Sequence, residues 1–390
     1  MRTLAPFAGW LVRQDRAEQV ASPMHDALSL EDRVATLRSN PFSFLQVTAS
    51  PQERAMAGSL AEPDPATALA HLVGSDAYRP LPPGLVVYRV TEGGRAHTGV
   101  VADVATAAFG DGRVLGHEAV NPARVEALAA YADAVPARSE LVALLHRRDA
   151  ALDATVAAVT ATQPAVAFGD PALRREQVWA VDDPAVVDTL VQRLGAGPLY
   201  VADGHHRVAA AMRREQETGA HPRVLCAVFA EDGLDLVAFS RRVTGPLDAT
   251  TLLAGLAQVC QVRPLDGPHP ARRGVLQVYL AGAWWELEPR APRRAGSAGL
   301  DVSVLHTELL GPLLGIWSVE DPRLVVVPQR AADHQVVASV DADGGALFRL
   351  AAPDVTDLAD LAERGEVMPA KATYFAPKTS AGVVLVLDGA

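Results

Sequence analysis

The stretch that most constrains the fold of this chain is Leu199–Arg214, which reads LYVADGHHRVAAAMRR. A short apolar run meets Asp203 and Gly204, and an alanine-rich run begins directly after Arg207. This pattern predicts a strand, a tight turn and the first turn of a helix. Backbone N–H groups at the start of a helix lack intrahelical partners and carry the positive end of the helix dipole, so the turn is suited to holding an anion.

The residues of this turn indicate a polyphosphate site. Gly204 lets the backbone approach a ligand closely. Side-chain donors come from the three residues that follow, His205, His206 and Arg207. The structural alternative is an Asp203 cap with a solvated first turn, but cations at a helix N-terminus oppose its dipole unless an anion lies among them. A zinc site on the paired histidines is a further alternative, although neither a nearby Cys nor a HExxH spacing accompanies them.

Composition limits the classes of protein to be considered. A length of 390 residues predicts two domains or one elaborated domain, and a composition that is 49% hydrophobic and 21% charged is typical of a folded globular protein. The net charge of −11 disfavours nonspecific binding to nucleic acid or to anionic membrane surfaces. With only Cys226 and Cys260, no disulfide framework is expected, which suits the reducing cytoplasm. No apolar run approaches the ~18 residues of a membrane span, so we expect a cytoplasmic protein without membrane partners.

Alternating and helical apolar patterns predict a mixture of sheets and helices along the rest of the chain. Hairpins are predicted around 93–94 and 281–282, a proline-rich break at 79–84, and helices at 64–78, 123–134, 150–160, 184–193 and 301–316. The proline- and charge-rich segment 264–273 predicts a boundary between a nucleotide-binding region, 1–265, and a C-terminal α+β region, 266–390, that closes the site.

A second candidate site is the pair His117 and Glu118, which follows a predicted strand and precedes a predicted helix. A carboxylate held at the end of a strand can act as a general base or bind a divalent metal. The alternative is a carboxylate placed near a helix N-terminus because the dipole favours it there.

Two further segments carry candidate residues. In GEVMPAKATYFAPK, Lys371 and Lys378 bracket Tyr374, and the prolines stiffen a loop that could clamp a nucleotide or its phosphates. Surface lysines around a buried aromatic side chain are the alternative. In the N-terminal turn SPMHD, His25 and Asp26 either serve the turn itself or line a ligand pocket.

Four separated motifs resemble a bacterial and archaeal family, the domain-of-unknown-function family numbered one thousand and fifteen. These motifs are PFAGW with SPMHD near the N-terminus, GHE at 116–118, ADGHHR at 202–207 and MPAKATYFAPK at 368–378. The resemblance implies a mixed α/β fold with a central nucleotide-binding unit like that of ParB and sulfiredoxin, elaborated by mixed sheet and helix regions. Free serine kinases of that group also carry a DGHHR turn and an upstream His-Glu pair.

Carried over by this resemblance, the residues from Gly204 to Arg207 hold nucleotide phosphates, and Glu118, beside His117, deprotonates a substrate hydroxyl. The chain departs from the family at SPMHD, where Pro-Pro-Tyr-Asp is usual, and at Ala372, where serine is common. Both departures bear on the identity of the substrate.

The leading interpretation is a kinase that transfers a phosphoryl group from a nucleotide to a hydroxyl, with free serine or a related amino acid as the acceptor class. ATP or ADP, with CTP as a further option, is the expected nucleotide, and Mg²⁺ bridges its phosphates with Asp203 as a ligand. His25, Asp26, Asp301 and Tyr374 are the expected substrate contacts. The alternatives are a ParB-like nucleotide-hydrolysing switch without an acceptor, and a catalytically silent binding module. The sequence leaves the acceptor, the nucleotide and the oligomeric state open.

Overall fold

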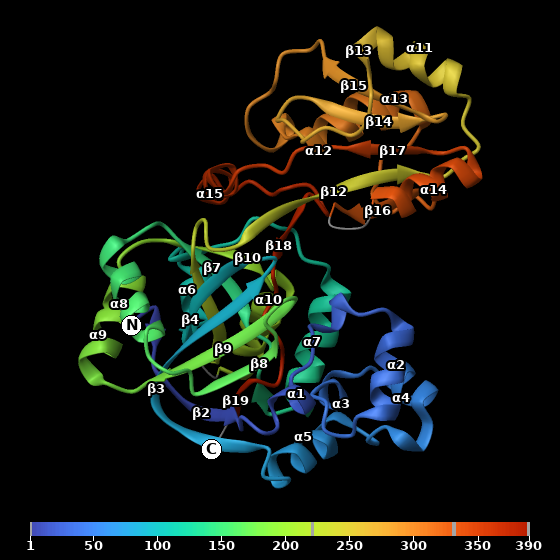
Figure 1. The fold of residues 1–390 in the computed structure, drawn as a ribbon. Coiled ribbons are helices and arrows are strands. Elements are labelled where there is room, and N and C mark those ends of the chain that lie inside the picture. The colour runs from blue at the N-terminus through green and yellow to red at the C-terminus, as the bar shows by residue number, and fades with distance from the viewer. Residues whose placement is uncertain (1, 220–221, 330–332, 388–390) are drawn as a thin grey trace. The chain divides into compact units, whose positions relative to one another are not determined.

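Two sheets, each with its own helices, divide the chain into two units (Figure 1). The computed structural model describes residues 2–219, 222–329 and 333–387. Unit 1 comprises residues 1–116, 120–234 and 377–390, and unit 2 comprises residues 117–119 and 235–376. The chain therefore returns to unit 1 at its C-terminal end. Residue 265, where the sequence predicts a domain boundary, lies inside unit 2.

Unit 1 is built on a 12-stranded mixed sheet with the order β5-β10-β7-β11-β4-β3-β2-β19-β6, in which β1 also pairs with β4, and β9 joins β3 to β8. Two pairs, β5 with β10 and β7 with β11, are parallel, and the others are antiparallel. The strands are β1 (Leu4–Ala5), β2 (Phe7–Val12), β3 (Tyr78–Glu92), β4 (Arg95–Ala105), β5 (Val114–Leu115), β6 (Ala137–Arg138), β7 (Val142–His146), β8 (Val166–Asp170), β9 (Arg174–Val181), β10 (Leu199–Asp203), β11 (Arg223–Ala230) and β19 (Val384–Leu387).

Helices cover this sheet and add a smaller cluster beside it. They are α1 (Ala17–Val20), α2 (Leu30–Ser39), α3 (Leu45–Thr48), α4 (Pro51–Ala57), α5 (Pro65–Gly74), α6 (Ala107–Gly110), α7 (Pro122–Ala134), α8 (Ala150–Thr160), α9 (Pro184–Leu194) and α10 (His205–Thr218), with 3-10 turns η1 (His25–Ala27) and η2 (Gly58–Leu60). The main core joins valine-rich strands to α8, α9 and α10, through side chains such as Leu152, Leu190 and Val208. This burial fixes the start of α10 against the sheet.

Most elements with a strong local signal form where the sequence predicts them. The β3–β4 hairpin turns at Gly93 and Gly94, both at positive φ. Asp64 caps α5 and Asp183 caps α9 through bonds to backbone N–H groups of the first turn. The mixed α/β class expected from the sequence is confirmed, whereas the ParB-like description of the central part stays a prediction.

The break predicted at 79–84 is wrong, because these residues continue β3. Trp10 of β2 pairs with Pro80, and Phe7 pairs with Gly84. Proline already holds the φ of an extended strand and lacks only the N–H donor, so it is tolerated where the ladder does not need that donor.

Unit 2 has a 7-stranded antiparallel sheet with the order β13-β15-β14-β17-β12-β16, and β18 also pairs with β12. Its strands are β12 (Asp235–Val243), β13 (Cys260–Leu265), β14 (Leu276–Leu280), β15 (Ala283–Pro289), β16 (Leu324–Pro328), β17 (Ala346–Arg349) and β18 (Thr373–Ala376). Its helices are α11 (Ala249–Val259), α12 (Asp301–Val304), α13 (Gly311–Leu314), α14 (Asp333–Asp343) and α15 (Val355–Glu363), with the 3-10 turn η3 (Gly296–Gly299) and the π-helical segment η4 (Leu305–Leu310).

The helix predicted at 301–316 is present but is not regular. It runs through α12, the π-helical segment η4 and α13, and it ends at Gly315 in the left-handed conformation. Across the described parts of both units, no helix combines the length and apolar character needed to cross a membrane.

Candidate functional site

The predicted strand, turn and helix start are present as β10, Gly204 and α10. Gly204 is the N-cap residue and has φ 103°, a conformation that costs other residues free energy. A Cβ at this position would lie 2.9 Å from Cγ2 of Val142 and 3.0 Å from Nη2 of Arg207. The position therefore requires glycine both for its backbone conformation and for the close approach of Arg207.

Asp203 is the centre of an ionic cluster formed with Arg207 and Lys378, the Asp203 cluster. Oδ2 accepts a hydrogen bond from Nη2 of Arg207 at 2.6 Å, and Oδ1 lies 3.0 Å from Nζ of Lys378. Arg207 also donates to the carbonyl of Leu141 at 2.9 Å. All three side chains are largely shielded, with exposed fractions of 18 to 24%. The cluster brings together two predicted phosphate-binding segments that are far apart in the sequence.

The charges in the Asp203 cluster keep its carboxylate ionised. Burial alone raises the pKa of Asp203, but the neighbouring charges of Arg207 and Lys378 outweigh this effect and hold that pKa below its usual value. One carboxylate faces two cations, so the cluster carries an excess of positive charge beside the N-terminus of α10. The cap predicted as the structural alternative for Asp203 is wrong, because Gly204 is the N-cap and Asp203 binds side chains instead.

A hydrogen bond to its backbone carbonyl fixes the position of Lys378. Its carbonyl accepts a hydrogen bond from Nη2 of Arg174. Arg174 in turn pairs with Glu176 at 2.8 Å, and Glu176 accepts bonds from the hydroxyl of Tyr88 and from both N–H and Oγ of Ser380. Glu176 is only 3% exposed. This buried network fixes the loop that carries Lys378.

The sequence predicted three consecutive cations in this turn, but its two histidines have structural roles instead. His205 is 7% exposed, and burial lowers its pKa to about 4, although the charge of Asp203 opposes the shift. Nε2 of His206 accepts a hydrogen bond from the backbone N–H of Asn121 at 2.9 Å, so that nitrogen carries no proton. Arg207 is therefore the cation of the first turn of α10.

Gly116, the first residue of the GHE motif, and Asn121, three residues after its last, lie against this same turn. A Cβ on Gly116 would lie 3.3 Å from the ring of His205, and Asn121, which His206 contacts, is the N-cap residue of α7. His117 and Glu118 themselves belong to unit 2, where the carbonyl of His117 accepts from N–H of Met368 at 2.8 Å and Glu118 forms a parallel bridge with Met368.

Lys371 belongs to unit 2 and is not one of the residues that define the Asp203 cluster. It adopts φ 54°, a left-handed conformation that is uncommon for lysine, and its carbonyl accepts from Nη2 of Arg241 at 2.8 Å. Arg241 is completely buried and also donates to His306 at 3.2 Å. Tyr374, on β18, stacks obliquely on Phe239 with ring centroids 5.1 Å apart. These contacts hold the loop of Lys371 to unit 2.

The remaining predicted substrate contacts have partners within their own units. His25 lies 3.0 Å from the buried carboxylate of Glu53, which Arg33 also engages. Asp301 is 7% exposed, pairs with Arg293 and accepts from N–H of Gly274 at 3.0 Å; burial raises its pKa against the opposing charge of Arg293. The side chain of Asp26 lies outside the described part of the structure.

Within the described residues, no three His, Cys, Asp or Glu side chains are grouped as a metal site would require. Both carboxylate oxygens of Asp203, the expected Mg²⁺ ligand, face cations. A metal ligand set at this position would therefore need oxygens from a bound phosphate.

Sequence reasoning did not identify Arg174, Glu176 and Arg241 as the residues that position the two lysines. One signal was available in the sequence, because the chain has only two lysines among its 35 basic residues, and both lie in one segment of eight residues. Because arginine supplies nearly all the other basic side chains, lysine at these two positions points to a need for a compact ammonium group.

The fold and the Asp203 cluster define a two-unit mixed α/β protein with a positively charged helix start in unit 1. Residues 4–305 match the family model described as "Protein of unknown function (DUF1015)". The chain belongs to this family, and the family assignment expected from the four motifs is confirmed. No curated protein matches the chain.

Solved structures provide more distant similarities. A free serine kinase variant in complex with ADP is 13% identical, with a TM-score of 0.38 over 72% of this chain and 92% of that chain. SbnI with a C-terminal truncation, from Staphylococcus aureus, is 11% identical, with a TM-score of 0.39 over 71% and 82%. A conserved hypothetical protein from Pyrococcus furiosus is 13% identical, with a TM-score of 0.37 over 72% and 93%. Similarities this distant assign neither a ligand nor an activity to this chain.

Proposed function

We propose that this protein is a nucleotide-dependent kinase that transfers a phosphoryl group to the hydroxyl of a small acceptor. The observation that carries the proposal is the Asp203 cluster, in which one carboxylate holds Arg207 and Lys378 beside the N-terminus of α10. Two shielded cations and the positive end of a helix dipole match the charge and the hydrogen-bonding capacity of a nucleotide polyphosphate.

The geometry of the cluster also supports binding of phosphate by exchange of an ion-pair partner. The ammonium group of Lys378 stands at the end of a flexible side chain. It can exchange one oxygen partner for another, because it lacks the planar geometry that constrains a guanidinium. A phosphate oxygen can thus replace Oδ1 of Asp203 at Lys378, while Arg207 stays anchored by Leu141. Asp203, freed on one side and ionised, is the residue that would hold Mg²⁺, whose charge would offset that of the phosphates.

The acceptor hydroxyl needs a base, and we assign this role to Glu118, beside His117. Glu118 takes the hydroxyl proton while the acceptor oxygen forms a bond to the terminal phosphorus and the bond to the leaving nucleotide breaks. His25, Asp26, Asp301 and Tyr374 remain the proposed contacts of the acceptor, with free serine or a related amino acid as its class. Lys371 remains a proposed phosphate contact.

The experiment incubates the purified protein with Mg²⁺, ATP or ADP, and a pool of hydroxyl-bearing amino acids, and it follows products by mass spectrometry. We expect one phosphorylated acceptor, lost in Glu118→Gln with nucleotide binding retained, and lost together with binding in Lys378→Met. Glu126→Gln, an exposed change on α7, is the matched control and should keep full activity.

Nucleotide hydrolysis without a phosphorylated acceptor would contradict the kinase and favour the nucleotide-hydrolysing switch. Nucleotide binding that Lys378→Met leaves unchanged would contradict the assignment of the Asp203 cluster.

A further inference from the structure

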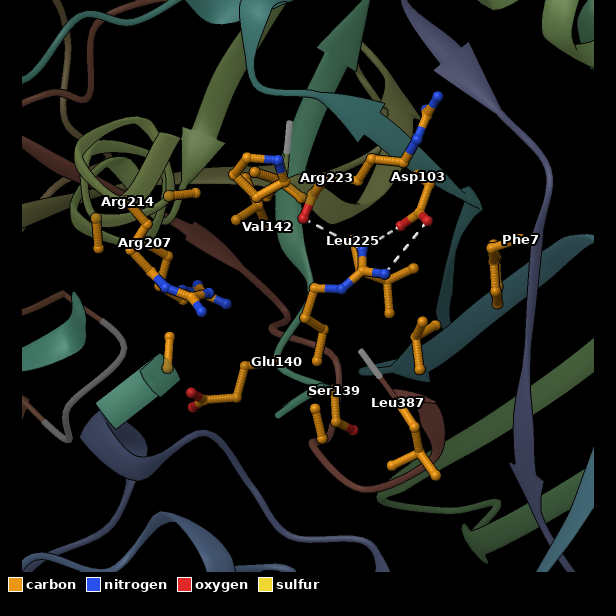
Figure 2. Close-up of a pocket in the computed structure, with 18 of the residues that line it drawn as sticks. Phe7, Asp103, Ser139, Glu140, Val142, Arg207, Arg214, Arg223, Leu225 and Leu387 are labelled. Atoms are coloured by element: carbon orange, nitrogen blue, oxygen red, sulfur yellow. Dashed lines mark hydrogen bonds and ion pairs between the residues drawn. The ribbon is translucent and has the colours of Figure 1, made fainter. Parts of the chain in front are cut away.

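A cavity of about 650 Å³ lies in unit 1 beside α10 (Figure 2). Its volume falls in the range of ~300–1,000 Å³ that is usual for small-molecule sites. Much of its wall is apolar and comes from separate elements: Phe7 on β2, Phe44 before α3, Leu128 on α7, Leu225 on β11 and Leu387 on β19. A ligand with an apolar or aromatic body would fit such walls.

The charged groups of the lining are mainly basic. Four arginines and two carboxylates line the cavity, namely Arg138, Arg207, Arg214, Arg223, Asp103 and Glu140. Four positive against two negative charges stand out in a protein whose net charge is −11. A local basic lining in an acidic protein favours a small anion over a neutral ligand.

One face of α10 supplies two of these arginines. Arg207 and Arg214 are seven residues apart, so they lie two turns apart on the same side of the helix, and Figure 2 shows both reaching the cavity. Each is held by a carboxylate outside the lining, Arg207 by Asp203 and Arg214 by Asp133 at 2.8 Å. The bond of Arg214 uses Nε. Among the described residues its two terminal nitrogens have no hydrogen-bond partner.

Arg138, another arginine of the lining, already has hydrogen-bond partners at both terminal nitrogens. Its Nη1 and Nη2 donate to the two carboxylate oxygens of Asp103, and Nη1 also donates to the carbonyl of Arg223, as the dashed lines in Figure 2 indicate. Within the lining, the charge of Arg138 is therefore neutralised by that of Asp103. The donors left for a ligand are therefore Arg214 and Arg207 on the α10 side, together with the buried Nη1 of Arg223 on β11, which has no hydrogen-bond partner among the described residues.

We propose that this cavity binds a small organic anion, one with an apolar or aromatic body whose carboxylate, sulfonate or phosphate group is held by Arg214 and Arg207. The site does not depend on the kinase function. Of the residues in the Asp203 cluster only Arg207 lines the cavity, so an anion there competes with Asp203 for the Arg207 guanidinium. Occupancy of the cavity would thereby alter the affinity of the Asp203 cluster for phosphate, and the effect would be reciprocal.

The test titrates the full chain with anilinonaphthalene sulfonate, a fluorescent aromatic anion, and in parallel with the neutral dye phenylnaphthylamine. Arg214→Met removes the proposed anion contact, and Arg213→Met is a closely matched control. Each change removes one partly exposed ion pair of α10, but Arg213 pairs with Glu217 and does not line the cavity. Ala211→Phe places a ring in the cavity, since Ala211 is part of its lining.

We expect Arg214→Met to weaken binding of the sulfonate about tenfold or more, the loss typical of one charge-assisted hydrogen bond, and to leave the neutral dye unchanged. Arg213→Met should bind both dyes as the unmodified chain does, and Ala211→Phe should weaken both. Circular dichroism and urea unfolding confirm that each variant is folded.

Equal weakening in Arg213→Met and Arg214→Met, or unchanged binding in Ala211→Phe, would overturn the proposal. Competitive displacement of the sulfonate by ATP, undiminished in Lys378→Met, would show that the cavity is the nucleotide site and would also overturn it. If the dyes behave as expected while no nucleotide is bound or consumed, the kinase fails and the anion site stands.

Discussion

His205 should make the stability of this protein fall steeply between neutral and mildly acidic pH. The perturbation is a change from pH 7.5 to pH 5, compared between the unmodified chain and His205→Gln. Burial lowers the pKa of His205 to about 4 in the folded chain, from an ordinary value of 6.5. The unfolded chain therefore binds a proton in a range of pH where the folded chain does not.

The sign and size follow from this difference. The stability supplied by the neutral ring is fully present above pH 6.5 and is lost as the pH falls toward 4, because the unfolded state binds more protons throughout that window. At pH 5 an ordinary histidine is almost fully protonated, whereas the folded ring is about one-tenth protonated, which corresponds to a loss of about 2 kcal/mol relative to pH 7.5.

The assay is urea unfolding followed by the fluorescence of the five tryptophans. Other groups also lower stability in acid, so the measured quantity is the extra pH-dependent loss in the unmodified chain over His205→Gln. His269→Gln, at a side chain 50% exposed, is the control and should retain the full loss. A loss between pH 7.5 and 5 that is the same in His205→Gln as in the unmodified chain would refute the burial of a neutral ring at this position.

Two further changes test the backbone and the network around the Asp203 cluster. Gly204→Ala should lower the free energy of unfolding by about 1–3 kcal/mol, because φ is 103° and the new Cβ would lie 2.9 Å from Val142. Gly197→Ala, which meets no atom within 4 Å, is the control in the same urea assay, and equal losses would contradict this reasoning. Glu176→Gln should cost about 2 kcal/mol, because Arg174 loses its buried partner and keeps only the partly exposed Glu92 at 3.4 Å. A loss below 1 kcal/mol by thermal or urea unfolding would show that this pair does not hold the loop.

The sequence predicted the structure best where the determinants are local. The strand, turn and helix from Leu199 to Arg214 depend on an apolar run, one glycine and an alanine-rich run, and all three lie within a few residues of each other. The β3–β4 hairpin and α8 follow equally local signals. Prolines in β3 misled the prediction because their tolerance depends on the neighbouring strand β2, which lies far away in the sequence.

The candidate site was only partly predictable for the same reason. Residue types marked Arg207 and Lys378 as phosphate ligands, but nothing local shows that both meet on the carboxylate of Asp203. The charge of the turn was overestimated, since the neutrality of His205 comes from burial and the role of His206 comes from the backbone of Asn121. Burial and distant partners are products of the tertiary fold, which residue spacing alone does not supply.

The most direct test of the Asp203 cluster as a nucleotide site uses the scarcity of lysine in this chain. Only Lys371 and Lys378 carry a side-chain amine, so acetylation by a water-soluble reagent can be followed at each by mass spectrometry. The protein is labelled with and without saturating Mg²⁺ and ATP or ADP, and the amine at the N-terminus of the purified protein serves as the internal reference.

If the phosphates bind at the Asp203 cluster, nucleotide should slow the acetylation of Lys378 at least tenfold relative to the reference, and the protection should disappear in Gly204→Ala. Slower labelling of Lys371 as well would support its proposed contact with the same nucleotide. An unchanged rate at Lys378 under saturating nucleotide would contradict the proposed function at its centre.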